Sequence, residues 1–243
     1  MGQDSYGVIG LAQLTDPSMK EYLPRIVSGF IGLVAFAVVW FGIAGRVNWW
    51  RGWGVLLAMV VYVGLLSWRL AKVNPELLLE RNRPGGVVEA WDRVLIGIYS
   101  VFLVVLLSLA ALDGGRYRWS RVPLGVQMSG WVLLILSGMA IWHVMMTNAY
   151  LSSWARLQED RGQVVVTEGL YGIIRHPMYL GVMLAILGMP LALGSWWALI
   201  PAVLIAGLFA YRAYREDRML RDGLPGYAEY AEAVKSGLLP GIW

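Results

Sequence analysis

The apolar residues of this chain gather in long blocks that contain no Asp, Glu, Lys or Arg. A helix needs about 20 apolar residues to cross the hydrocarbon core of a bilayer. The blocks are residues 26–45, 52–68, 94–112, 122–155 and 177–211. Each of the first three predicts one membrane helix. The fourth predicts a helix over about 123–146, followed by an interfacial extension.

The fifth block has 35 residues, which is too long for a single crossing at about 1.5 Å per residue. Pro190 and the Gly194-Ser195 pair lie near its middle, where they can interrupt a helix. We therefore predict a helical hairpin with arms at 177–193 and 196–211. The expected fold class is an all-α integral membrane protein with about six transmembrane helices, a C-terminal helical hairpin and a cytoplasmic cap over the site.

Positive charges predict the orientation of these helices. With both termini in the cytoplasm, the inner segments hold 15 Lys and Arg residues and the outer loops hold 5. Cytoplasmic loops of membrane proteins carry such an excess. We expect a multi-pass protein of the cell inner (plasma) membrane, with a helical scaffold over residues 1–150, containing about four transmembrane helices. Residues 151–243 are expected to hold the functional motifs.

Composition supports a membrane protein and excludes several other classes. Hydrophobic residues make up 58% of the chain and charged residues 15%, whereas a soluble domain carries about a quarter charged residues. The absence of cysteine excludes disulfides, thiolate metal sites and a cysteine nucleophile. With only two histidines, no transition-metal site is predicted. The net charge of +4 is accounted for by the cytoplasmic faces, and no basic run interleaved with aromatic residues predicts nucleic-acid binding.

The polar residues that could carry chemistry lie in three segments on the predicted cytoplasmic side, residues 72–93, 148–176 and 212–243. Arg175 and His176 stand directly before the fifth apolar block, at the edge of the membrane. Ionisable residues in such places are costly and indicate function. Each also has a structural explanation, because His176 could cap the helix that Pro177 begins and Arg175 could anchor it at the interface.

Motifs in the last 80 residues or so resemble the isoprenylcysteine carboxyl methyltransferase family, to which the phospholipid methyltransferases are related. The first motif comprises Gly169, Tyr171, Arg175, His176, Pro177, Tyr179 and Gly181. After the hairpin follow Arg212, Glu216, Asp217 and Leu220, then Gly226, Tyr227 and Tyr230, and a terminal Leu239-Pro240. The order and spacing of three motifs are more specific than any one of them. The first 150 residues resemble the family only as a generic scaffold.

The resemblance implies a methyltransferase that binds S-adenosylmethionine at the cytoplasmic membrane edge. It implies catalytic roles for Glu216, which would bind the donor's ammonium group, and for Arg175, which would hold an anionic acceptor. The implied cofactor-binding residues are Gly169, Tyr171, His176, Pro177, Tyr179, Gly181, Arg212, Glu216 and Asp217. Among these, the two tyrosines would wall the adenine or the sulfonium, the latter by cation–π attraction.

The acceptor is open at this stage. An amphiphilic or lipid-like molecule, methylated on a carboxylate, thiol or other group, would suit a site at the membrane edge, where membrane lipids are also partners. One alternative is a membrane-embedded, NADPH-dependent oxidoreductase of the sterol-reductase type. Met178 and Val182 depart from the motif of those reductases. The second alternative is a non-enzymatic membrane protein. His143 and Asn148 are expected to make hydrogen bonds between helices rather than to take part in chemistry. The role of residues 72–93 and the oligomeric state stay open.

Overall fold

The computed structural model describes residues 17–81 and 88–241, and every regular element longer than a turn in this part of the chain is a helix. Six long helices occupy the six predicted segments. They are α1 (Pro17–Ala44), α2 (Trp50–Val73), α4 (Ala90–Ala110), α5 (Leu124–Thr147), α6 (Pro177–Leu193) and α7 (Leu199–Gly223). Two short helices, α3 (Pro75–Glu80) and α8 (Tyr227–Ala233), accompany them. The prediction of an all-α membrane protein is confirmed.

Among the residues that the structure describes, four segments are long and apolar enough to cross a membrane: Val27–Ala44, Trp50–Val73, Ala90–Tyr117 and Leu124–Thr147. The third includes a π-helical stretch, Ala111–Tyr117, that continues α4. The helix α6 is equally apolar but has only 17 residues, and α7 carries charges in its second half. The count of six crossings and the cytoplasmic position of the termini therefore stay predictions.

The hairpin of α6 and α7 turns where the sequence predicts, although only one of the two expected breaks acts. Pro190 lies inside α6 without ending it. The helix ends at Leu193, because Gly194 adopts a left-handed conformation (φ 79°) that caps it. At the other end, α7 continues past residue 211 to Gly223, through a segment whose charges alternate in sign at helical spacing, and Gly226 (φ 80°) forms the turn into α8.

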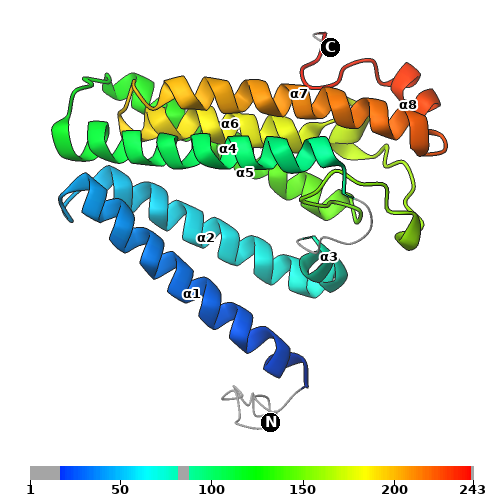
Figure 1. The fold of residues 1–243 in the computed structure, drawn as a ribbon, viewed down its shortest axis with the longest axis horizontal. Coiled ribbons are helices and arrows are strands. Elements are labelled where there is room, and N and C mark those ends of the chain that lie inside the picture. Colours follow the sequence, from blue (N-terminus) through cyan, green and yellow to red (C-terminus); the bar gives the residue numbers. More distant parts are fainter. Residues whose placement is uncertain (1–16, 82–87, 242–243) are drawn as a thin grey trace, which may run out of the picture.

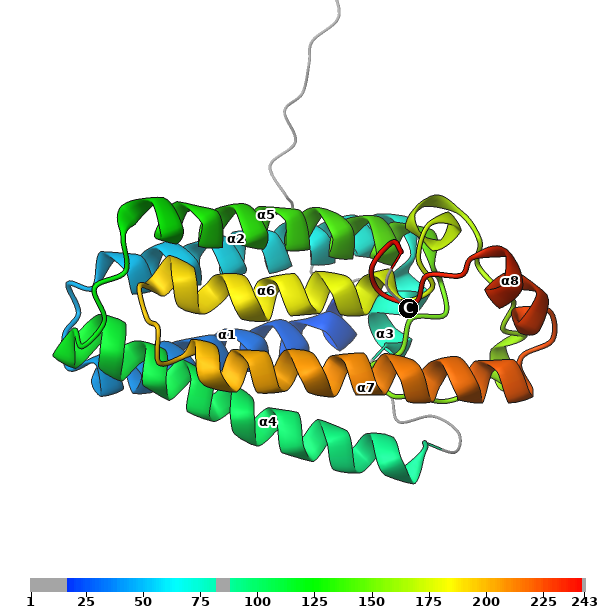
Figure 2. The same cartoon turned by 90° about the horizontal axis from the view of Figure 1, so that it is seen from above.

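Helices α4 to α7 run lengthwise beside one another, while α1 diverges from α2 and leaves the group (Figures 1 and 2). The closest pair is α5 with α6, which meet through glycines. A Cβ atom on Gly130 of α5 would lie 2.5 Å from the backbone nitrogen of Ala192 and 2.8 Å from the carbonyl oxygen of Gly188 in α6. Small residues allow such close backbone approach between membrane helices.

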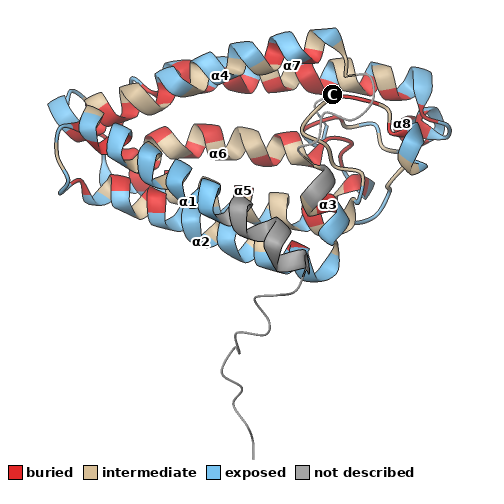
Figure 3. Cartoon of the chain, turned by 60° about the horizontal axis from the view of Figure 1, so that its bottom comes forward, coloured by how far each residue is buried: buried red, intermediate tan, exposed pale blue. Residues whose placement is uncertain are grey.

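The outer faces of α1 and α2 are apolar and exposed (Figure 3). Phe30 and Val38 of α1, for example, leave 66% and 68% of their surface uncovered. Large apolar surfaces of this kind are unfavourable in water and match the chemistry of lipid tails. The buried core lies instead where the inner faces of α1, α2, α4, α6 and α7 meet.

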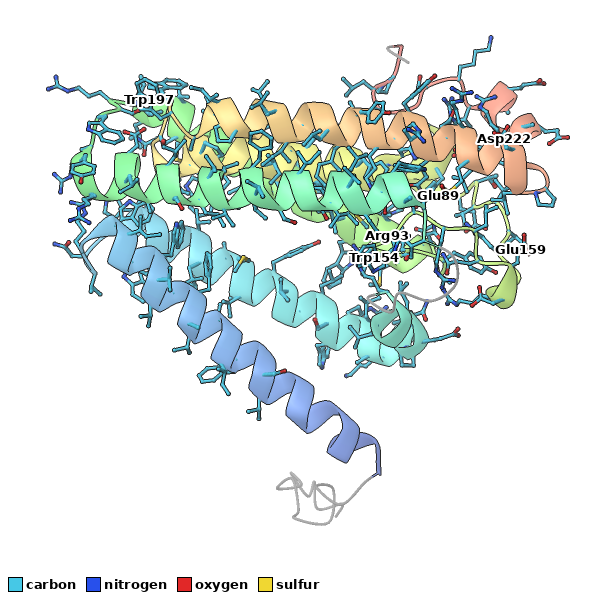
Figure 4. The ribbon with its side chains drawn as sticks, viewed as in Figure 1. Glu89, Arg93, Trp154, Glu159, Trp197 and Asp222 are labelled. Atoms are coloured by element: carbon cyan, nitrogen blue, oxygen red, sulfur yellow. The ribbon has the colours of Figure 1, made fainter. Side chains whose placement is uncertain are left out.

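A buried carboxylate, Asp113, stabilises the end of the bundle at which the α6–α7 hairpin turns. It accepts hydrogen bonds from the Ser120 hydroxyl and backbone (2.5 and 2.7 Å) and from the Ser195 hydroxyl (2.6 Å). These bonds join the π-helical end of α4 to the hairpin turn. Trp197, beside this turn, lies at the opposite end of the molecule from Trp154 and Glu159 (Figure 4).

Candidate functional site

A cavity lies at the end of the bundle marked by Trp154 and Glu159 (Figure 4), where the segment after α5 folds against α7 and α8. Its walls come from residues 148–179 on one side and from Glu216 to Tyr230 on the other. The lining combines aromatic side chains with polar groups. The lining residues used below are Asn148, Trp154, Tyr171, Arg175, His176, Pro177, Met178, Tyr179, Glu216, Tyr227 and Tyr230.

Tyr171 is held in the cavity wall from two sides. Its hydroxyl accepts a hydrogen bond from the Asn148 side chain (2.8 Å), and its backbone carbonyl accepts one from the Tyr230 hydroxyl (2.7 Å). Burial raises the pKa of Tyr171 well above its ordinary value, so the phenol is neutral. Asn148 therefore positions a motif residue, in keeping with the predicted hydrogen-bonding role, and both residues line the cavity.

Gly169 starts this motif in a left-handed conformation (φ 60°) against His143 of α5. A Cβ atom at this position would overlap the His143 ring. The same ring nitrogen, Nε2, accepts a hydrogen bond from the Leu170 backbone N–H (3.3 Å). His143 thus seats the motif on the end of α5, which agrees with its expected role as a hydrogen-bonding residue.

Asp217 of α7 is the centre of a buried network below the cavity. Arg175 donates to both of its oxygens, from Nε (2.7 Å) and Nη2 (3.3 Å). The His176 ring, the Tyr227 hydroxyl and the Arg221 guanidinium also contact it, at 3.3, 2.9 and 3.0 Å. Burial alone would raise the pKa of Asp217, but the hydrogen bonds from His176, Arg175 and Arg221 hold it well below its usual range. The carboxylate is therefore ionised, and both of its oxygens accept hydrogen bonds.

Arg175 also ties the C-terminal segment to the motif. Its Nη1 donates to the carbonyl oxygens of Val234 and Lys235, both at 2.7 Å. The backbone N–H groups of Arg175 and His176 donate to the carbonyls of Ser236 (3.0 Å) and Gly237 (2.9 Å). Because protein groups occupy most of this guanidinium's donors, the geometry departs from the predicted role of Arg175 in holding the acceptor. It indicates a framework role.

His176 precedes α6 but makes no side-chain capping bond to the helix. Its ring is nearly parallel to that of Tyr179, with centroids 5.7 Å apart and an interplanar angle of 18°. Capping, the structural explanation for this histidine, is therefore not what its side chain does. His176, Pro177 and Tyr179 together form one wall of the cavity at the N-terminal end of α6.

Glu216 is the one carboxylate among the described lining residues. It accepts a hydrogen bond from the Tyr179 hydroxyl. No Lys, Arg or His of the described chain forms an ion pair with it, in contrast to its neighbour Asp217. Glu216 therefore presents to the cavity a carboxylate that has no direct ion-pair partner among the described residues, as a site for a cationic group requires.

Arg212, which the resemblance implied as a cofactor-binding residue, directs its hydrogen bonds to Asp92 of α4. The two side chains form a buried pair with distances of 2.6 and 3.0 Å. Asp92 was not identified from the sequence. The available signal was an acid two residues before the third apolar block, where an unpaired charge would be costly.

The structure thus divides the predicted site residues into two groups. Tyr171, Arg175, His176, Pro177, Tyr179 and Glu216 line the cavity. Gly169, Gly181, Arg212 and Asp217 support it from outside: a Cβ atom on Gly181 would lie 2.8 Å from Ile141, so this glycine allows α6 to approach α5. Trp154, Tyr227 and Tyr230 line the cavity without having been predicted as site residues, although the last two belong to the third motif quoted above.

A second, apolar hollow of about 880 Å³ lies between α2, α5 and α6, and we call it the α2–α5 groove. It is lined by apolar residues such as Met59 and Trp142, with few polar groups. Tyr62 and His143 are among its walls, and the Tyr62 hydroxyl donates to the Gly138 carbonyl (3.0 Å). Because His143 also contacts the motif at Gly169 and Leu170, the groove reaches the vicinity of the cavity.

Comparison with known proteins agrees with this architecture. Residues 126–223 match the phospholipid methyltransferase family. The cobalt-zinc-cadmium resistance protein CzcN of Cupriavidus metallidurans is 31% identical over 157 residues, which cover 62% of this chain and 68% of that protein. The chain belongs to the phospholipid methyltransferase family. The family match spans nearly all of α5 and the whole of α6, which carries Tyr179 and Gly181, and of α7, which carries Glu216; it confirms the resemblance to membrane methyltransferases.

Proposed function

We propose that this membrane methyltransferase uses S-adenosylmethionine as its methyl donor, bound in the cavity between residues 148–179 and α7. The observation that carries the proposal is Glu216. It is a carboxylate without a cationic partner among the described residues, fixed by Tyr179 and surrounded by aromatic side chains. A carboxylate in this setting favours a cationic ligand, and a cavity rich in rings favours a ligand with an aromatic or cationic surface.

The residues present fit this donor. Glu216 would bind the ammonium group, and Tyr171 and Tyr179 would contact the sulfonium or the adenine. His176 and the N-terminal end of α6, where Pro177 and Met178 line the cavity, would face the donor's carboxylate. When bound, the donor supplies an electrophilic methyl group on a sulfonium.

The protein contributes alignment and exclusion of water rather than covalent chemistry. Glu216, Tyr171 and Tyr179 would hold the donor, whose methyl carbon would accept the acceptor's lone pair as its bond to sulfur broke, with the bonding electrons left on sulfur. Holding two reactants in line is worth about 7–11 kcal/mol in favourable cases. The Arg175–Asp217 network serves this end by fixing His176 and the C-terminal segment against the cavity.

We further propose that the acceptor is amphiphilic or lipid-like. The α2–α5 groove supports this, because it is apolar and lies beside the motif, on helices that are apolar enough to cross a membrane. An acceptor with an apolar chain could reach the cavity from the bilayer while the donor arrives from water. We propose, from the distribution of Lys and Arg in the sequence, that the protein crosses the inner membrane several times and that its cavity faces the cytoplasm.

Isothermal titration of the detergent-purified protein with S-adenosylhomocysteine, with NADPH as the parallel ligand, tests the donor. We expect saturable micromolar binding of S-adenosylhomocysteine alone. Glu216→Gln should weaken it at least tenfold, because it removes the charge that faces the ammonium. Glu229→Gln, which changes an exposed acid of α8, is the matched control and should bind normally. Binding of NADPH instead, or of neither ligand, would overturn the proposal.

A further inference from the structure

Arg81 lies immediately after α3 and is fixed by its backbone. Its N–H donates to the Leu77 carbonyl, and its own carbonyl accepts from the Ser153 N–H, both at 3.0 Å. These bonds join α3 to the segment that walls the cavity. These bonds fix the backbone of Arg81 beside the segment that leads to the first motif.

The Arg81 guanidinium has no carboxylate within ion-pair distance among the described residues. The one hydrogen bond of its side chain in this part of the chain goes from Nη1 to the Met145 sulfur (3.0 Å), and a thioether is a weak acceptor. By contrast, other arginines of this region have carboxylate partners. Arg175 and Arg212 each bind both oxygens of a buried aspartate, and Arg161 pairs with Glu76.

Burial lowers the pKa of the Arg81 guanidinium, while the phenols of Tyr171, Tyr179 and Tyr62 act in the opposite direction. A guanidinium nevertheless keeps its charge in proteins. A partly buried cation without an anion is unfavourable, and supplying an anion would remove that penalty. The charge of Arg212, which is itself paired with Asp92, also lowers the pKa of Arg81.

Arg81 is in the wall of neither hollow, but tyrosines from both walls act on its charge. Tyr171 and Tyr179 line the cavity, whereas Tyr62 lines the α2–α5 groove. Its hydrogen-bond partner Met145 belongs to a buried cluster that includes Met146 of the groove and Met178 of the cavity. An anionic group at Arg81 would therefore lie near the methyl donor, with an apolar chain attached to it extending into the groove.

We propose that Arg81 binds the anionic head group of the acceptor, a carboxylate or a phosphate, and so selects amphiphiles that carry one. This inference rests on the proposed function and gives Arg81 the acceptor-binding task that Arg175 was predicted to perform. The planar fork of a guanidinium suits two oxygens of one anion.

The test uses the full chain in micelles of a neutral maltoside detergent, with isotope-labelled methionine methyl groups observed by NMR. Met145→Leu identifies the Met145 signal, which reports on Arg81 because the two side chains touch. Sodium dodecanoate and dodecyl phosphate are the anionic probes, dodecanol is the uncharged probe, and inorganic phosphate is the anion without a chain. We expect the Met145 signal to shift with the two anionic amphiphiles alone.

Arg81→Gln should weaken this response to dodecanoate at least tenfold. It should leave the affinity for S-adenosylhomocysteine within twofold of the original value. Arg69→Gln, which changes an exposed arginine of α2, is the control and should respond as the unaltered protein does.

An equal shift with dodecanol, or one as large with inorganic phosphate, would overturn the proposal without any variant. Loss of S-adenosylhomocysteine binding in Arg81→Gln would also overturn it, because Arg81 would then belong to the donor's carboxylate. Failure of the unaltered protein to bind S-adenosylhomocysteine would refute the donor instead, whatever the methionine signal does.

Discussion

Arg212 of α7 and Asp92 of α4 form a two-point ion pair, although 120 residues separate them in the chain. Asp92 also accepts the backbone N–H of Ala155 (2.7 Å), and Arg212 donates to the carbonyl of Ser153 (2.9 Å). The pair therefore joins three parts of the molecule: the start of α4, the charged half of α7 and the segment that forms one wall of the cavity.

Asp92→Asn should destabilise the protein by about 3 kcal/mol or more, because it leaves the buried Arg212 charge without its counter-ion. The measurement is the denaturant midpoint of unfolding in mixed micelles. Arg93→Gln, which changes an exposed neighbour in the same helix turn, should unfold at the original midpoint. An unchanged midpoint for Asp92→Asn would show that the pair contributes nothing to stability.

The Asp217 network should make stability depend on pH in a defined direction. The pKa of Asp217 is held below its unfolded value of about 3.9, so its contribution is complete above that pH and is lost as the pH falls towards the folded pKa. The difference in melting temperature between the unaltered protein and Asp217→Asn should be constant from about pH 5 upward and should shrink below about pH 4.

Differential scanning fluorimetry across this range provides the measurement. Asp222→Asn is the matched control, because Asp222 lies on the same helix but is exposed. Its effect should be small at every pH. A gap between the unaltered protein and Asp217→Asn that widened on acidification would contradict the direction of the pKa shift.

Gly169→Ala and Gly162→Ala separate backbone strain from steric overlap. Both glycines have a φ of 60°, so alanine at either position costs about 1 kcal/mol in backbone energy. Gly162 has free space around its Cβ position, whereas a Cβ at Gly169 overlaps His143. Gly169→Ala should therefore be the more destabilising change, and it should also weaken S-adenosylhomocysteine binding, because Tyr171 follows two residues later.

The double variant Gly169→Ala/His143→Ala removes the overlap but not the strain. It should recover part of the stability lost in Gly169→Ala, as measured by the same unfolding experiment. If Gly162→Ala and Gly169→Ala cost the same, the contact with His143 would have no role in seating the motif.

Gly130→Ala should disturb the packing of α5 on α6, whereas Gly125→Ala on the same helix should not. A Cβ at Gly130 would meet the backbone of α6 at 2.5–2.8 Å, and one at Gly125 would meet nothing within 4 Å. Overpacking of this kind typically costs about 1–3 kcal/mol. Thermal unfolding in detergent measures the difference, and equal midpoints for the two variants would mean that the helices can separate freely.

The helices of this protein could be predicted because their cause is local. Uncharged blocks of the right length, a glycine at the hairpin turn and alternating charges after residue 211 each determine structure over a few turns. Pro190 shows the limit of such reasoning. Proline can break a helix, but the neighbouring helices support α6 through this residue, and only Gly194 supplies the conformation that ends it.

The sequence predicted the residues that line the cavity more readily than it predicted the ion-pair partners of the arginines. Tyr171, His176, Tyr179 and Glu216 meet in one cavity, because the motif and α7 return to the same end of the bundle. Arg175 and Arg212 were assigned to ligands, whereas they bind Asp217 and Asp92. The partners in these two pairs are 42 and 120 residues apart in the chain. Sequence spacing over such distances does not tell which carboxylate a guanidinium will face, because that depends on how the helices pack.

The bonds from the C-terminal segment to Arg175 have a consequence for biosynthesis. Arg175 leaves the ribosome 60 residues before Lys235, whose carbonyl it binds, and all of α7 is made in between. The helices up to α7 can therefore enter the membrane before the carbonyl groups that bind Arg175 have been synthesised. In a nascent chain that stalls after α7, Arg175 would lack these carbonyl partners, and the framework of the cavity would form only once residues 234–237 have been made.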